Sequence, residues 1–249
     1  MAMKVDLLGA KIDALGLDET VGRIAEFIRA GRPHWVMTIN PEFLYRAQFD
    51  SELRDLAKRA DLVTPDGVGI VWACRVAGNP VPERVTGIDL MLRLVESAAV
   101  KGWRIFLLGA APGVADEAAV RLRLSYPDLQ VVGVCHGYYK EDEEAEAAGV
   151  VREARPDLLF VALGAPKQER WMDRYLIETR AAVAVGVGGS FDVLAGRVRR
   201  APRWIRRLHL EWLFRLVKEP SRWRRQLVLP LFAWRVIKEY KLKKFPPET

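Results

Sequence analysis

Six short apolar runs, which alternate with segments of helical period, are the feature that most constrains how this chain folds. The runs are rich in β-branched residues and only a few residues long, as is typical of strands buried on both faces. They lie within the segments 34–40, 61–66, 103–110, 129–139, 157–166 and 181–192. Because a helix between successive strands makes those strands parallel, we predict an α/β fold with a mostly parallel sheet flanked by helices on both faces.

The N-terminal segment departs from this pattern. Residues 4–15, KVDLLGAKIDAL, alternate apolar and polar side chains around Gly9, which predicts a pair of strands at the edge of the sheet. A helix should follow from Asp18 to near Gly31, since both residue types are favoured at helix ends.

The C-terminal segment carries the positive charge of the chain. Residues 197–249 hold 16 Lys and Arg against 4 Asp and Glu, a net charge of +12, which leaves about −5 on residues 1–196. Acidic residues become rare between Ala195 and Arg203. We therefore predict an α/β domain over residues 1–196 and a short helical appendage over residues 197–249, and we expect the appendage to meet any anionic partner.

Tryptophans and leucines alternate with the arginines of this appendage. Pro220 and Pro230 should divide it into about three short helices. Basic amphipathic helices with Trp and Leu on the other face are typical of membrane surfaces, although a solvated basic face and a nucleic-acid patch are alternatives. The longest apolar run, residues 227–234, is far shorter than the about 20 residues that a spanning helix needs.

Cysteine and histidine usage indicates neither disulfides nor a metal site. Cys74 and Cys135 are far apart, and no apolar leader follows Met1, so we expect a reducing, cytoplasmic compartment. The three histidines are scattered, and the acidic run at residues 141–144 lacks the DxD pattern with which many sugar-nucleotide enzymes hold a divalent ion. We expect chemistry that needs no metal ion and no cofactor.

Polar residues and glycines gather where the predicted strands end, which is where open parallel sheets bind ligands. Asp66, in TPDG, is either the N-cap of the next helix or a general base that takes a proton from an attacking hydroxyl. Gly109 and Gly113, in LLGAAPG, either let a phosphate approach the backbone or form an ordinary tight turn.

Two further loops carry candidate binding groups. Gln168, in PKQE, and its neighbour Lys167 could bind a diphosphate or a sugar hydroxyl, or lie in solvent. Asp192, in GVGGSFD, could accept hydrogen bonds from a ribose or a base, or cap a turn. The LLGAAPG loop is not GxGxxG, and no acidic residue stands about 20 residues further on at a second strand end, so a nicotinamide-dependent oxidoreductase is not favoured.

Eight motifs, in order along nearly the whole chain, together resemble the WecG/TagA/CpsF family of bacterial glycosyltransferases. They are TINPEF, TPDGVGIVW, PERVTGIDL, FLLGAAPGV, VVGVCHGYY, LGAPKQERW, GVGGSFDVLAGRVRRAPRW and LEWLFRLVKEPSRWRRQ. Phe214 stands where a tyrosine is common in that family, and HGYY replaces the frequent GYF. With this resemblance we expect a Rossmann-like catalytic domain over residues 1–196.

The resemblance implies an inverting transfer of an N-acetylmannosamine-type sugar from UDP to the 4-hydroxyl of GlcNAc on undecaprenyl diphosphate. Such a step serves wall teichoic acid synthesis or, with the uronic acid donor, enterobacterial common antigen synthesis. The identity of the donor sugar, the polymer and the oligomeric state stay open.

The resemblance also implies roles for individual residues. Asp66 matches the proposed general base of the family. Pocket residues of the family are matched by Thr38, Asn40, Arg84 and Gln168. Arginines that close over the site and meet the donor diphosphate are matched by Arg215, Arg222 and Arg225, and Tyr138 and Asp192 are our candidates for contacts to the uridine.

The expected partners are a UDP-sugar donor, a lipid-linked GlcNAc diphosphate acceptor and an anionic membrane surface, and not nucleic acid. This places the protein peripherally on the inner face of the cell membrane. Two alternatives belong to other classes: a nucleic-acid-binding protein that uses the basic appendage, and an NAD-dependent oxidoreductase on a Rossmann-like fold.

Overall fold

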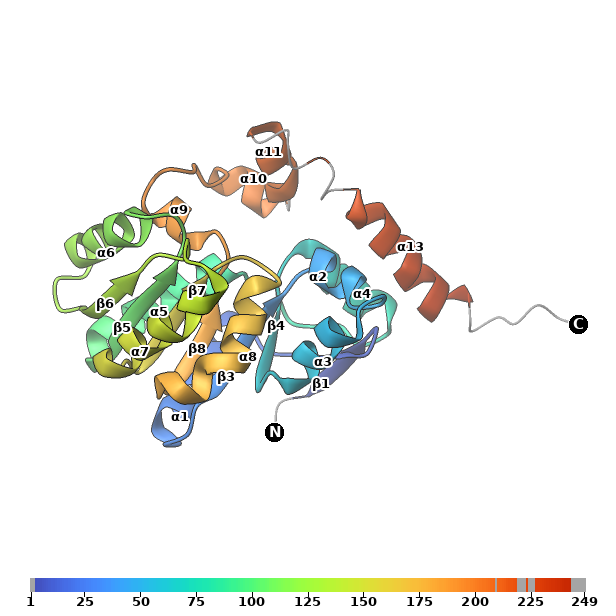
Figure 1. The fold of residues 1–249 in the computed structure, drawn as a ribbon. Coiled ribbons are helices and arrows are strands. Elements are labelled where there is room, and N and C mark those ends of the chain that lie inside the picture. The colour runs from blue at the N-terminus through green and yellow to red at the C-terminus, as the bar shows by residue number, and fades with distance from the viewer. Residues whose placement is uncertain (1–2, 209, 219–222, 224–226, 243–249) are drawn as a thin grey trace, which may run out of the picture.

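A six-stranded parallel sheet with helices on both faces forms the centre of the protein, which confirms the predicted fold class (Figure 1). The computed structural model describes residues 3–208, 210–218, 223 and 227–242, and of Arg215 it describes the backbone alone. The strand order is β4-β3-β8-β7-β5-β6, and every neighbouring pair is parallel. The strands are β1 (Lys4–Leu7), β2 (Ala10–Asp13), β3 (His34–Ile39), β4 (Leu62–Pro65), β5 (Arg104–Gly109), β6 (Gln130–Cys135), β7 (Leu158–Ala162) and β8 (Val183–Gly186).

Two layers of helices cover the sheet. One apolar cluster joins the sheet to α3, α7 and α8, and a second joins its other face to α1, α5, α6 and α9. The helices of the domain are α1 (Leu17–Arg29), α2 (Pro41–Arg46), α3 (Ser51–Arg59), α4 (Val68–Val76), α5 (Gly87–Lys101), α6 (Val114–Ser125), α7 (Glu144–Ala154), α8 (Lys167–Thr179) and α9 (Ser190–Leu194), with a short 3-10 turn at Glu141–Glu143 before α7.

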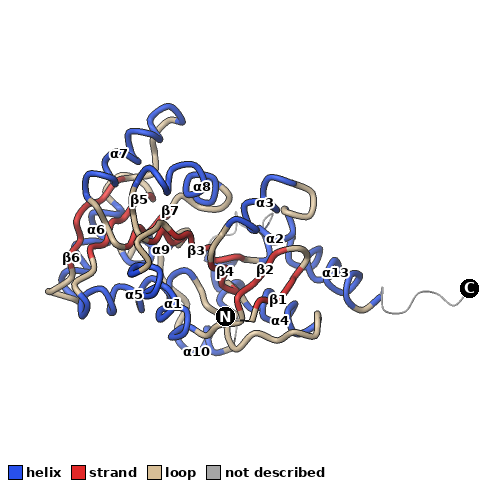
Figure 2. Tube along the Cα trace, turned by 90° about the horizontal axis from the view of Figure 1, so that it is seen from below, coloured by secondary structure: helices blue, strands red, loops and turns tan. Residues whose placement is uncertain are grey.

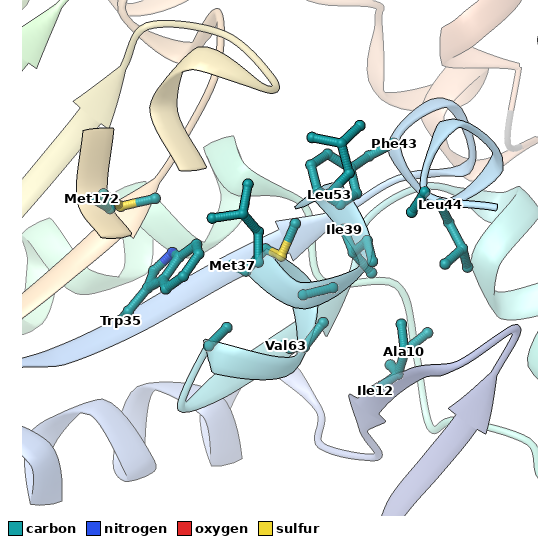
Figure 3. Packing of buried hydrophobic residues seen from close by; sticks show 14 of the residues in the cluster. Ala10, Ile12, Trp35, Met37, Ile39, Phe43, Leu44, Leu53, Val63 and Met172 are labelled. Carbon is teal, nitrogen blue, oxygen red and sulfur yellow. The ribbon is translucent and has the colours of Figure 1, made fainter. Parts of the chain in front are cut away.

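Strand β3 shows why the apolar runs have no polar alternation. Trp35, Met37 and Ile39 belong to the first cluster, where Figure 3 shows them beside Val63 of β4. Val36, which points to the opposite face, belongs to the second cluster. Because helices cover both faces, every residue of β3 is buried. Burial on both faces explains why this strand is a continuous apolar run.

The N-terminal strand pair lies at the sheet edge, as predicted, but it forms a separate sheet. Strands β1 and β2 pair antiparallel with each other alone, and they pack beside β4, the edge strand (Figure 2). Asp13 attaches the hairpin to that edge, because its Oδ2 accepts a hydrogen bond of 2.8 Å from the backbone N–H of Val63. The helix that follows begins at Leu17 after an N-cap at Gly16, slightly before the predicted start at Asp18.

The described part of the appendage contains α10 (Arg203–Arg207), α11 (Glu211–Lys218) and α13 (Val228–Tyr240). The prediction that Pro230 separates two helices is wrong. This residue lies in the first turn of α13, where its missing N–H has no intrahelical partner to lose. Pro220 lies outside the described residues.

Helix α13 packs onto the α/β domain against α2 and α4 (Figure 1). Phe232 and Val236 are buried in the first apolar cluster, and the Tyr240 hydroxyl accepts a hydrogen bond of 2.8 Å from the N–H of Leu8 in the N-terminal hairpin. The appendage therefore contributes to the core as well as to the surface. Among the described residues, every helix is too short or too polar to cross a bilayer.

Candidate active site

A cleft of about 880 Å³ opens at the carboxyl ends of the parallel strands. Its floor comes from the loops after β3, β4, β5, β6, β7 and β8, as the rule for open α/β sheets predicts. Its far wall comes from the appendage, through Glu211 and Trp212 of α11 and through Leu229 and Phe232 of α13. The volume is within the range of sites that take drug-sized ligands.

Most of the predicted site residues meet in this cleft, although they come from separate loops. Those that line it are Thr38, Asn40, Asp66, Arg84, Tyr138, Gln168 and Asp192. Parallel strands bring their carboxyl ends to one edge of the sheet, which is why residues up to about 150 positions apart in sequence converge.

Asp66 follows β4 directly and does not cap the next helix. The N-cap of α4 is Gly67, whose φ of 96° lies in the left-handed region that favours glycine. The Asp66 Oδ2 instead accepts a contact of 3.4 Å from the backbone N–H of Gly87, the first residue of α5. The positive end of that helix dipole stabilises a carboxylate at this place.

Thr38 and Asn40 also make contacts that hold the loops in place. The Thr38 hydroxyl donates to the carbonyl oxygen of Gly186 at 2.9 Å, which joins the ends of β3 and β8. The Asn40 Oδ1 caps α2 by accepting from the N–H of Phe43 at 2.9 Å. Both side chains thus shape the cleft through the backbone that surrounds it.

Gln168, in the first turn of α8, bridges two loops. Its Oε1 accepts from the N–H of Gly188 at 3.0 Å, and its Nε2 donates to Oε1 of Glu169 at 2.8 Å. Gly186 permits this approach, because a Cβ there would lie 2.7 Å from the Gln168 Nε2. Burial raises the pKa of Glu169 to about 7, against an ordinary value of 4.5, although the hydrogen bond from Gln168 opposes the shift.

Arg84 lines the cleft from the loop before α5 and pairs with the appendage. Its Nη1 lies 3.4 Å from Oε2 of Glu211, at the start of α11. Arg200 lies on the other side of Glu211, with Nε 3.5 Å from Oε1, and its Nη2 donates to both oxygens of Asp89 at 2.7 Å. The four charged side chains form a cluster that we call the Glu211 cluster: Arg84, Asp89, Arg200 and Glu211.

Gly109 and Gly113 are not among the residues that line the cleft; Ala110 and Ala111 between them are. Gly109 has φ 126°, and a Cβ there would lie 2.5 Å from the backbone of Ala162 in β7. Gly113 is the N-cap of α6 with φ 81°. Close strand packing and a tight turn therefore account for both glycines, and an approach of phosphate to them stays a prediction.

Lys167 is not among the residues that line the cleft. Its Nζ lies 3.4 Å from the carbonyl oxygen of Gly137 and 4.8 Å from the ring centre of Tyr139. Of the arginines predicted to close over the site, Arg215 lies in α11 with only its backbone described. Arg222 and Arg225 lie outside the described residues.

Sequence reasoning missed the apolar wall of the cleft and the Glu211 cluster. The wall includes Trp72 of α4 and Phe232 of α13, whose apolar spacing also suits an ordinary core helix, so nothing in the sequence singled them out. A signal did exist for Thr86, since the pattern Thr-x-x-Asp before an apolar run is typical of a helix start. Thr86 caps α5 by accepting from the N–H of Asp89 at 3.2 Å.

No group of three or more His, Cys, Asp or Glu side chains able to hold a metal ion occurs within the described ranges. The charged side chains near the cleft include Asp66, Asp192 and the arginines and carboxylates of the Glu211 cluster. Burial alone would raise the pKa of Asp89, but the Thr86 hydroxyl and the Arg200 guanidinium outweigh it and hold that pKa below its usual range. Asp89 is accordingly an anion that anchors Arg200.

Comparison with known proteins finds relatives that match most of the length of the chain. The chain is 38% identical over 215 residues to an N-acetylglucosaminyldiphosphoundecaprenol N-acetyl-beta-D-mannosaminyltransferase of Bacillus spizizenii, covering 86% of this chain and 83% of the relative. It is 39% identical over 209 residues to the protein of the same name from Bacillus subtilis, with 84% and 81% covered. For the Staphylococcus aureus protein of that name the identity is 32% over 244 residues, with 97% and 95% covered.

The family model described as "Glycosyl transferase WecG/TagA/CpsF family" matches residues 5–245. That span includes the cleft, all but the first residue of the N-terminal hairpin, and all three described helices of the appendage. The chain therefore belongs to the WecG/TagA/CpsF family of glycosyltransferases.

Proposed function

We propose that the protein transfers N-acetylmannosamine, or its uronic acid, from a UDP donor to the 4-hydroxyl of GlcNAc on undecaprenyl diphosphate, in the synthesis of wall teichoic acid or a related cell-surface polysaccharide. The names of its relatives support the sugar and the acceptor. The observation that carries the proposal is that Asp66 and Arg84 line one cleft beneath the appendage, since this reaction needs a base and a positive charge side by side.

The proposed reaction is a single displacement with inversion and without a metal ion. Asp66 takes the proton of the acceptor hydroxyl while the oxygen forms a bond to the anomeric carbon. The bond from that carbon to the β-phosphate oxygen breaks, and UDP departs with the electron pair. Arg84 and the arginines of the appendage, Arg215, Arg222 and Arg225, stabilise the negative charge that grows on UDP.

The appendage has a second proposed role, which is to hold the enzyme on the inner face of the cell membrane. Its described helices expose large apolar side chains next to many cations, as a surface that binds anionic lipid does. Those side chains include Trp204, Leu213, Val217 and Trp234, of which Val217 is 70% exposed and Trp234 is 60% exposed. A lipid-linked acceptor would then meet the cleft from the bilayer, and residues 197–249 would close over it.

Replacing Asp66 by Asn tests the proposal, because Asn keeps the size of the side chain and removes the base. We expect turnover to fall by about 10²–10⁴-fold, while UDP binding, measured by calorimetry, changes little. The assay follows UDP release with UDP-N-acetylmannosamine and a soluble lipid-diphosphate-GlcNAc analogue. Normal turnover of the variant would exclude Asp66 as the base.

Glu178→Gln is a matched control for that variant, since Glu178 is an exposed carboxylate of α8 away from the cleft, and its turnover should equal that of the wild type.

Two further experiments identify the substrate and the partner. Turnover with a panel of other UDP sugars identifies the donor sugar. Binding of the intact protein to anionic vesicles, compared with duplex and single-stranded nucleic acid at physiological salt, decides the partner of the appendage. Tighter binding to nucleic acid would reject the membrane role.

A further inference from the structure

Glu211 is the residue through which the appendage contacts Arg84. It is the first residue of α11, and its side chain is 11% exposed while lining the cleft. Its two carboxylate oxygens face two different arginines: Oε2 lies 3.4 Å from Arg84, and Oε1 lies 3.5 Å from Arg200. One side chain of the appendage therefore contacts the candidate catalytic arginine and a second arginine at the same time.

The cluster extends from Glu211 to the first turn of α5. Arg200 is held by both oxygens of Asp89, and the Asp89 Oδ2 in turn accepts from the Thr86 hydroxyl at 2.6 Å. Thr86 is the N-cap of α5, and the next residue, Gly87, donates its N–H to Asp66. A chain of contacts around the start of α5 thus connects Glu211 of the appendage with Asp66 and Arg84 of the cleft.

Electrostatics show what Glu211 adds to this set. Arg84 and Arg200 have side chains only 17% and 15% exposed, so solvent screens their repulsion weakly. Asp89 hydrogen-bonds Arg200 directly and acts on Arg84 only as a more distant charge. Glu211, by contrast, lies within ion-pair distance of Arg84. Removal of the Glu211 charge would leave Arg84 without this neighbouring anion, and a long side chain that loses such a contact regains rotamer freedom.

We propose that Glu211 is a positioning residue that holds the Arg84 guanidinium at the cleft when α11 is seated. The inference rests on the proposed function and deepens it, because it assigns the appendage a role in orienting a catalytic-domain side chain. Seating of α11 then also orients Arg84, so this guanidinium is held in place for the donor diphosphate only when the appendage is in place.

Glu211→Gln keeps the shape of the side chain and removes its charge. We expect kcat to fall about tenfold while the KM for the donor moves less than threefold, since Arg84 acts chiefly on the charge that develops on the leaving UDP. The dissociation constant for UDP, which carries that charge, should rise by a similar factor. Glu211→Asp, which keeps the charge on a shorter stem, should recover part of the loss.

Glu117→Gln is the matched control. Glu117 pairs with Arg197 through two contacts of 3.1 and 2.8 Å and so also joins the start of the appendage to the α/β domain, but it lies outside the cleft. If the appendage needed only to be tied down, the two variants would behave alike. We expect Glu117→Gln to keep normal turnover, and an equal loss in both variants would overturn the proposal.

A double-mutant cycle with Arg84→Ala isolates the coupling. In that background Glu211→Gln should change UDP affinity less than twofold, because the side chain through which it acts is gone. A full tenfold further loss would show that Glu211 acts elsewhere and would overturn the proposal. Thermal melting of each variant identifies misfolding. If Glu211→Gln is misfolded, Glu211→Asp is compared with the wild type in its place. A wild type that binds no UDP would instead reject the proposed function.

Discussion

Replacing Phe232 by Ala tests whether α13 belongs to the folded core. Phe232 is 2% exposed and packs in the first apolar cluster, and its ring lies 3.9 Å from the position that a Cβ on Gly69 would occupy. Truncation of a buried Phe removes the transfer free energy of the ring and leaves a cavity, at a total cost of about 3–5 kcal/mol. Because Phe232 also lines the cleft, water can fill part of that cavity, so we expect about 3 kcal/mol.

Thermal unfolding followed by circular dichroism measures this loss. At about 2–4 °C for each kcal/mol in a chain of this size, Tm should fall by about 6–12 °C. Limited trypsin digestion gives an independent readout, because Arg235 and Lys238 lie on the same helix and should be cleaved faster when α13 is loosened.

The control comes from the same helix. Trp234 is 60% exposed, so Trp234→Ala should change the free energy of unfolding by no more than about 0.5 kcal/mol, although it should weaken binding to anionic vesicles. If Phe232→Ala left both Tm and the trypsin rate unchanged, the packing of α13 against α2 and α4 would be refuted as a source of stability.

Two further substitutions test buried positions. The folded-state pKa of Glu169 is about 7 against 4.5, so the folded protein holds the extra proton between these values and its stability falls as pH rises through that window. Glu169→Gln removes the effect, and urea titration should show it more stable than the wild type at pH 8, by up to about 3 kcal/mol, with little difference at pH 4.5. Gly109→Ala should cost more than about 2 kcal/mol, since its Cβ would lie 2.5 Å from the backbone of Ala162.

A specific outcome would contradict each of these two predictions. A wild type and a Glu169→Gln variant with parallel stability curves from pH 4.5 to 8 would show that the buried carboxyl has an ordinary pKa. For the glycine, Gly149→Ala in α7 is the control, because nothing lies within 4 Å of its Cβ position; it should stabilise the helix by about 0.5–1 kcal/mol. An equal gain at Gly109 would exclude the close approach of β5 and β7.

Local sequence patterns predicted the elements well where burial on both faces leaves a strong signal. The run HWVMTI is buried throughout and forms β3, and the position of Asp66 directly after a strand follows from the turn at Gly67. The contact of Asp66 could not be read from sequence, because its partner Gly87 is 21 residues away and meets the Asp66 side chain only in space. The role of Asp66 as a base stays a prediction.

The appendage shows the limit of the same reasoning. Charge counting predicted a separate appendage over residues 197–249, and it treated that segment as a surface. Phe232 and Val236 are nevertheless core residues, and Pro230 begins a helix instead of ending one. An apolar face on a basic helix has the same pattern whether lipid or protein covers it, so only the position of α2 and α4 decides which part is buried.

By itself, the sequence determined the alternation of strands and helices, the edge of the sheet at which the site lies, and the sign of the charge at the C-terminus, because each of these depends on neighbours along the chain. Tertiary structure alone decided which polar residues lie together. Glu211 is one of the few acidic residues in a basic segment, and it acquires significance only because it lies between Arg84 and Arg200. Contacts between residues 127 positions apart, such as Arg84 and Glu211, depend on packing of the whole chain and leave no periodic trace in the sequence.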